Sequence, residues 1–238
     1  MAITRENFRS LLNSFLKDDA QYIGAEEKER FITSAKKLYD GDQPREVVVD
    51  DDSPDGSTYD FSLPDDWTDG FSVILGQIEY PIKSSDSWQS PQYVDGNDWI
   101  IYKTSTTTKL RFLSFIPASG YIFRYTYTVP HTLSESSCTI NEFDWEAVCH
   151  LAASFCFTAL AAKYSQIENP TIEADVIDYQ RRHDECLGLA KVHEEFYNQH
   201  MGIGKEKEMT TTGAQATKEL DMDYIFGANY LTHPKGWR

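Results

Sequence analysis

The acidic run at residues 51–56 is the part of this sequence that comes nearest to a metal-binding loop. It reads DDSPDG, which is similar to the start of an EF-hand loop, where acidic side chains coordinate calcium and a glycine takes the sixth position. If Gly56 is that glycine, the twelfth position falls on Ser62, whereas calcium needs a bidentate glutamate there. The flanking residues also have the composition of strands. We therefore expect a solvated acidic loop, with weak cation binding by residues 50–55 left open.

Histidine and cysteine side chains are the other candidates for metal binding or nucleophilic chemistry. His183 and Cys186 are spaced one helical turn apart, and His193 lies further along the same side of the predicted helix. A zinc site needs four ligands at a recognisable spacing, and the sequence offers no second pair. Cys149 and His150 are adjacent on a predicted helix, so their side chains point in different directions and form a poor nucleophile–base pair. We expect these residues to have packing roles.

The usual enzyme signatures are absent from the sequence. It contains no GxSxG, HExxH, P-loop or GxGxxG motif. Glu79 and Asp98 border predicted strands, but their spacing does not pair them as acid and base. The four cysteines form no CxxC pair, so we expect free, buried thiols instead of disulfides. The chain is therefore predicted not to be an enzyme and to hold no catalytic residue, cofactor or metal.

Negative charge dominates the composition and is concentrated in one region. The formal net charge is −16, and between Asp40 and Asp69 there are eleven acidic residues against the single base Arg45. Proteins that read DNA present basic patches to the phosphates, so this class is disfavoured. A negative wall repels phosphates instead of holding them, which still allows DNA to pass by without binding.

Helical periodicity marks both ends of the chain. Thr4 is a plausible N-cap for a first helix, and a second helix is expected over residues 25–39, ended by Gly41 and Pro44. Residues 142–166 form a helix that is apolar nearly all round, which predicts a central, covered position. Its uncharged apolar run is about 16 residues long, too short for a membrane span of roughly 20. With no apolar signal region after the first residues, we expect a soluble chain made inside the cell.

The last helix is expected over residues 172–200, about 28 residues or roughly 42 Å. Its apolar residues are spaced alternately four and three apart, which is typical of a coiled-coil seam. A long helix with one narrow stripe must pack against something equally long. The stripe consists of Ile172, Val176, Tyr179, His183, Cys186, Ala190, His193 and Tyr197.

The middle of the chain, residues 46–131, is rich in β-formers and aromatic residues. Strands are expected at 46–50, 59–63, 71–80, 99–103, 110–116 and 121–129, and a hairpin turn at 117–120 is expected to join the last two. The last strand alternates, with Tyr121, Phe123, Tyr125 and Tyr127 on one face. These aromatic residues fit the core of an antiparallel sheet or small sandwich better than a ligand site.

The end of the chain combines a flexible linker with an apolar terminus. Residues 201–217 are rich in Gly, Thr, Lys and Glu, whereas residues 223–238 contain four aromatic side chains. A disordered tail normally lacks such apolar surface, so we expect this terminus either to fold back or to dock on a neighbouring molecule. The aromatic residues are Tyr224, Phe226, Tyr230 and Trp237.

Together these elements predict an α+β fold. Two N-terminal helices, a buried helix and a long C-terminal helix form a helical bundle, which carries a large antiparallel β-rich insertion and an extended C-terminal tail. The predicted boundaries are residues 1–45 for the N-terminal helices, 46–131 for the insertion, 132–200 for the C-terminal helices and 201–238 for the tether and docking tail.

In this order of parts the chain resembles the head-to-tail adaptor, or connector, proteins of tailed bacteriophages and gene-transfer particles. The sequence YDFSLPDDW at residues 59–67, followed by IEYP at 78–81, is similar to the family's turn into its β region. Residues 121–130 resemble the strand before the last helices, and residues 147–164 resemble its alanine-rich helix.

The resemblance implies a structural virion protein without catalytic activity, assembled in the host cytoplasm. It would form a homo-oligomeric ring of twelve subunits beneath the portal protein and contact a tail or nozzle protein on its other side. Double-stranded DNA would pass through the ring without specific binding. The resemblance implies no membrane partner. On this reading the long helix meets the next subunit through Val176, Tyr179, His183 and Tyr197. The portal-docking residues of the tail are expected to be Tyr224, Ile225, Phe226, Tyr230, Leu231 and Trp237.

A different class of protein also fits part of the pattern. The β region could be a cation- or glycan-binding module on a helical base, as in a receptor-binding accessory protein. Sugar would then bind through Trp88, Tyr93 or Trp99, because aromatic rings offer flat apolar faces.

Overall fold

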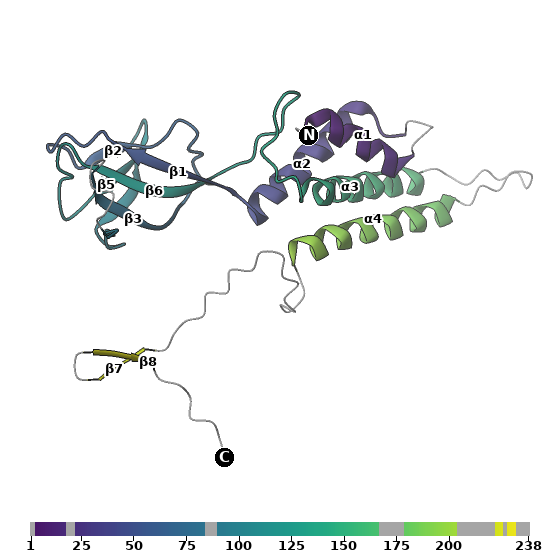
Figure 1. Cartoon of the computed structure of the whole chain (residues 1–238). Helices are drawn as coiled ribbons and strands as arrows, with labels where there is room; N and C mark the ends of the chain where they lie inside the picture. The colour runs from purple at the N-terminus through teal and green to yellow at the C-terminus, as the bar shows by residue number, and fades with distance from the viewer. Residues whose placement is uncertain are drawn as a thin grey trace, which may run out of the picture. The chain divides into compact units, whose positions relative to one another are not determined.

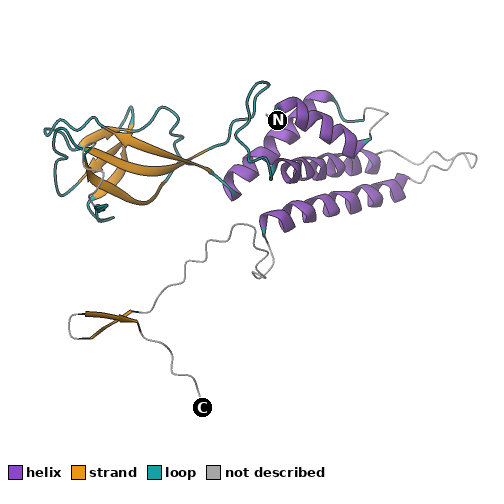
Figure 2. Cartoon of the chain, viewed as in Figure 1, coloured by secondary structure: helices purple, strands orange, loops and turns teal. Residues whose placement is uncertain are grey.

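The computed structural model describes residues 3–17, 22–83, 90–166, 179–203, 222–225 and 228–231. The chain divides into two units, Met1–Ile203 and Gly204–Arg238, and each is described by itself. Within the described residues the structure is a mixture of helices and antiparallel strands (Figures 1 and 2), which confirms the predicted α+β class.

The first unit contains four helices and six strands among its described residues. The helices are α1 (Arg5–Leu16), α2 (Ala25–Asp42), α3 (Trp145–Ser165) and α4 (Tyr179–Met201). The strands are β1 (Arg45–Asp51), β2 (Asp60–Ser62), β3 (Ile74–Ile82), β4 (Trp99–Lys103), β5 (Thr108–Phe112) and β6 (Ile122–Val129). The second unit contributes β7 (Met222–Ile225) and β8 (Ala228–Leu231).

Helix α1 begins at the predicted cap. The backbone N–H of Thr4 donates to the side-chain oxygen of Asn7 at 2.8 Å, so the sequence closes its own helix start. Phe8, Leu12 and Leu16 follow on one face and are buried. Their i, i+4 spacing places them in a single line against the core.

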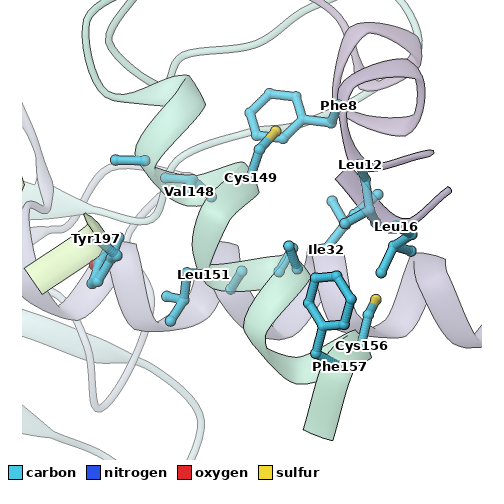
Figure 3. Close-up of a cluster of buried hydrophobic side chains, with 14 of the residues drawn as sticks. Phe8, Leu12, Leu16, Ile32, Val148, Cys149, Leu151, Cys156, Phe157 and Tyr197 are labelled. Carbon is cyan, nitrogen blue, oxygen red and sulfur yellow. The ribbon is translucent and has the colours of Figure 1, made fainter. Parts of the chain in front are cut away.

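Helix α3 is the centre of the helical part. It contacts α1, α2 and α4, and Figure 3 shows side chains from all four helices meeting in one cluster. Among the described residues, α3 is the helix that could cross a membrane by length and composition, yet 61% of its apolar window is buried inside the fold. The expected role as a buried core helix is therefore confirmed.

The β part consists of two three-stranded antiparallel sheets, with strand orders β1-β6-β3 and β2-β5-β4. The predicted hairpin at residues 117–120 is wrong, because β5 and β6 belong to different sheets. Residues 113–121 cross between the sheets instead, and Gly120 takes a left-handed φ of 80° there. Local turn residues indicated the reversal of the chain but not which strands it would pair.

Aromatic rings fill the space between the two sheets. Phe123, Tyr125 and Tyr127 of β6 are buried, as their alternation predicted. Phe123 contacts Phe61 and Phe112 of the other sheet, with ring centroids 5.0 and 5.3 Å apart. These edge-to-face contacts supply stabilisation beyond simple burial.

Several element boundaries differ from the sequence-based ranges. Helix α2 continues through Gly41 to Asp42, whereas β5 ends at Phe112 and β3 begins only at Ile74. Helix α3 starts at Trp145, because residues 142–144 form the turn before it. The described part of the last helix starts at Tyr179, and residues 172–178 lie outside the described residues.

Two chain segments join the helical part to the β part, and buried polar contacts tie them together. The backbone N–H of His131 donates to the carboxylate of Asp40 at 2.8 Å, and Lys36 donates to the same group at 2.7 Å. Tyr39 donates its hydroxyl to Asp144 at 2.8 Å. Because Asp40 is only 4% exposed, it needs these partners to offset its desolvation. The contacts fix the end of α2 against the segment that follows β6.

We predict that Phe123→Ala lowers the free energy of unfolding of the β part by about 3–5 kcal/mol, because it leaves a cavity between the sheets. Val48→Ala on β1 is the matched control. Its side chain is 59% exposed, so the change should stay within about 0.5 kcal/mol. Denaturant unfolding of both variants checks this, and equal losses would contradict the assigned core.

Candidate functional site

The predicted stripe of α4 packs on α3 of the same chain. Ala190 and Tyr197 are buried in this contact, and Nδ1 of His183 lies 2.8 Å from the backbone carbonyl of Ala161. Tyr197 also donates its hydroxyl to Asp42 at the end of α2. The long partner that the stripe requires is therefore α3, a helix of 21 residues.

This packing changes the prediction that the stripe meets a neighbouring subunit. Tyr197 is 3% exposed and His183 is committed to α3, so neither offers its side chain to a second copy. Val176 and the side chain of Tyr179 lie outside the described residues. The spacing was interpreted correctly as a packing seam, but spacing alone cannot tell an internal partner from an external one.

A second apolar line, which was not predicted from the sequence, lies on the exposed side of α4. Its residues are 41–53% exposed although all four are large and apolar. Leu189, Val192 and Phe196 are spaced three and four residues apart, which places them along one side of the helix between charged neighbours that obscured the pattern. Ile203 follows two residues after the helix ends at Met201. We call this set the α4 line: Leu189, Val192, Phe196 and Ile203.

Two histidines meet at the α3–α4 contact. Nδ1 of His150 lies 2.7 Å from Nδ1 of His193, which is hydrogen-bonding distance. The rings of Phe15, Phe157 and Phe196 pack around the pair, with centroids 4.5–5.4 Å from one or other imidazole. Burial lowers the pKa of both histidines, and His150 lowers the pKa of His193 further. The sequence placed both residues on helices, but it could not show which positions of the two helices face each other.

The acidic loop is held by its own turns. Asp51 accepts the backbone N–H of Ser53, and Asp55 accepts that of Ser57, each at 2.8 Å. Hydrogen bonds from Ser57 lower the pKa of Asp55. Among the described residues, no group of three or more His, Cys, Asp or Glu side chains could hold a metal ion.

Some of the acidic residues of the β part are neutralised by basic partners. Arg111 and the Tyr102 hydroxyl lower the pKa of Asp60 to about 2, so this carboxylate is ionised under ordinary conditions. Arg124 lowers the pKa of Asp50 in the same way. Among the described residues of this part, the ion pairs are Asp50 and Glu79 with Arg124, Asp60 with Arg111, and Asp69 with Lys103.

Tyr93 and Trp99, the described residues among those expected to bind sugar, do not line the same cleft. Trp99 lines a cleft of about 560 Å³ between β4 and residues 67–74, together with Trp67, Val73 and Ile100. Tyr93 is exposed but is not among the residues that line this cleft. Trp88 lies outside the described residues. The cleft therefore does not carry the glycan alternative.

The tail contains a small hairpin. Strand β7 pairs antiparallel with β8, so that Tyr224 lies opposite Asn229 and Ile225 opposite Ala228. Tyr230 and Leu231 lie on β8. The two other predicted docking residues, Phe226 and Trp237, lie outside the described residues.

No protein-family model matches the chain, and no curated protein matches it. It is similar to chains in two solved structures, described as the neck of an empty GTA particle computed with C6 symmetry and the neck of a native GTA particle computed with C12 symmetry. The identity is 12% in both cases, over 78% of this chain and 93% of the other, with TM-scores of 0.28 and 0.27. This distant likeness to neck components assigns no role to any residue.

We predict that Ala190→Asp destabilises the helical part by several kcal/mol, because it buries an unpaired charge between α3 and α4. Leu189→Asp, one position earlier on the α4 line, should change the stability by no more than about 0.5 kcal/mol. Thermal unfolding followed by circular dichroism separates the two. A loss of stability in both variants would contradict the assignment of buried and exposed sides of α4.

Proposed function

We propose that this chain is a structural adaptor of a virion, without catalytic activity, that joins the portal vertex of the capsid to the tail. Its subunits form a closed ring, for which we expect twelve copies, around a channel through which DNA passes. The observation that carries the proposal is the C-terminal unit: a small hairpin on a long tether, with more apolar residues than a free tail would keep.

A hairpin with two strands of four residues is too small to be stable alone in water. It gains stability when it adds to a partner's sheet or enters an apolar groove. The 18 residues at positions 204–221 reach up to about 60 Å when extended, enough to cross to another protein. We assign the portal as that receiver, with Tyr224 and Ile225 of β7 and Tyr230 and Leu231 of β8 as docking residues. Phe226 and Trp237, outside the described residues, remain predicted docking residues.

Ring closure requires each subunit to present two different faces, which meet head to tail. The α4 line supplies one of these faces, since three of its apolar side chains lie on a helix that α3 already holds in place and Ile203 follows just after that helix. This role replaces the one first given to the buried stripe. The opposite end of the ring is left to a tail or nozzle protein.

The net negative charge of the chain suits a channel through which DNA moves without binding. A net charge of −16, with eleven acidic residues between Asp40 and Asp69, repels phosphates and disfavours binding. An adaptor needs this property, because a channel that held DNA would stop it. The fold of the acidic region is maintained by internal pairs such as Arg124 with Asp50, which leaves the remaining carboxylates to set the surface potential.

We predict that removing residues 204–238 leaves a folded first unit that no longer binds portal rings. Co-sedimentation with portal rings checks the binding, and a melting curve checks the fold. The paired substitution Tyr224→Ser with Tyr230→Ser, which keeps the length of the tail, should also weaken binding. Thr211→Ala in the tether is the control, expected to bind normally. Undiminished portal binding by the truncated chain would contradict tail docking.

We predict that Leu189→Asp with Val192→Asp abolishes ring formation but leaves the subunit folded, because charge on the α4 line prevents apolar contact with the next copy. Lys191→Asp adds charge of the same sign to an exposed position off the line and should still form rings. Electron microscopy of particles assembled on portal rings distinguishes them. Rings formed by the double variant would show that subunits meet elsewhere.

A further inference from the structure

The contact between α3 and α4 contains four of the six histidines of the chain. Each of them has a polar partner across or beside this contact. His183 faces the carbonyl of Ala161, and His200 faces the carboxylate of Asp144 at 2.8 Å. His150 and His193 face each other.

The His150–His193 contact depends on the number of protons that the two rings hold. An Nδ1–H···Nδ1 bond needs a proton on one nitrogen and a free lone pair on the other. A first added proton goes to Nε2 of the donor ring and leaves this bond intact. A second must go to the accepting Nδ1, so that two donors then face each other and the bond is lost.

The surroundings of the pair offer little compensation for the added charge. Helix α1 contributes the ring of Phe15, α3 contributes Phe157, and α4 contributes Phe196. The charged group that favours protonation is Glu146, one turn before His150 on α3. Its attraction is outweighed by burial, because the pKa of His150 is still lowered. Two imidazolium rings with centroids 4.9 Å apart would also repel each other.

We propose that the His150–His193 pair is an acid-sensitive latch that holds α4, the helix from which the tail departs, against α3. Above the ordinary histidine range the pair is neutral and closed. As the pH falls, the pair takes up protons more readily when α4 is displaced and the rings reach water, so acid favours opening. This inference concerns the packing of one chain and does not depend on the adaptor function.

The direction of the pH effect on the α3–α4 contact follows from the linkage between proton binding and stability. A histidine whose pKa is lowered in the closed state contributes stability that is present above its ordinary pKa of about 6.5 and is lost as the pH falls below it. His183 donates from Nδ1 in either charge state, so it can keep its bond to the carbonyl. Acid therefore weakens the contact at the His150–His193 pair.

Hydrogen exchange on the full chain at pH 7.5, 6.5 and 5.5, corrected for intrinsic rates, tests the latch. Strand β6, whose residues include no histidine, is the internal reference. The double variant His150→Phe with His193→Phe keeps the aromatic stack but cannot titrate. His183→Asn, in the same contact, is the matched control that leaves the pair in place.

We expect α4 in the unaltered chain and in the control to lose protection relative to β6 as the pH falls, by up to about tenfold per pH unit for each proton taken up. In the double variant α4 should keep its protection. The same loss in the double variant, or no loss in the unaltered chain, would overturn the proposal. If the double variant does not fold, histidine NMR of the unaltered chain decides: two rings must titrate together below pH 6.5, and independent titration of all rings at or above about 6.5 would refute the latch.

Discussion

The structure of the helical part depends on the burial of α3. This helix is apolar on nearly every side, and its residues Val148, Ala152 and Cys156 are fully buried. Such a surface must be covered, because exposing it to water costs roughly 25 cal/mol for each Å². Helices α1 and α2 cover part of it, and α4 covers another. The need to cover α3 therefore decides which side of α4 turns inward and which is left for other molecules.

The same constraint organises the features that concern function. With Ala190 and Tyr197 turned toward α3, the α4 line is presented outward. Helix α4 ends at Met201, and the chain continues after Ile203 into the tail unit. Buried contacts of Asp40 and His131 connect this helical framework to the β part. The core therefore sets the position of α4. This helix carries most of the α4 line, and the chain that follows it leads to the tail hairpin.

Regular patterns in the sequence predicted the elements well, whereas long-range pairing was not predictable. The Thr4 cap, strand β4 and the inward aromatic residues of β6 follow from local chemistry, and the structure confirms them. Sheet membership of β5 and the facing of His150 and His193 depend on residues far apart in the chain. The stripe on α4 was recognised, but its packing partner was assigned to another subunit. Periodicity does not show whether the partner belongs to the same chain or to a neighbouring one. Of the predicted tail residues, Phe226 and Trp237 lie outside the described residues.

The central claim is that the chain forms a closed ring on the portal and binds the portal through its tail. Cryo-electron microscopy of the full chain mixed with purified portal rings tests this most directly. We predict a closed ring of this chain on the portal, with each α4 line against the next subunit and each hairpin in contact with the portal. Portal rings without added density, or a bound chain whose tail does not touch the portal, would contradict it.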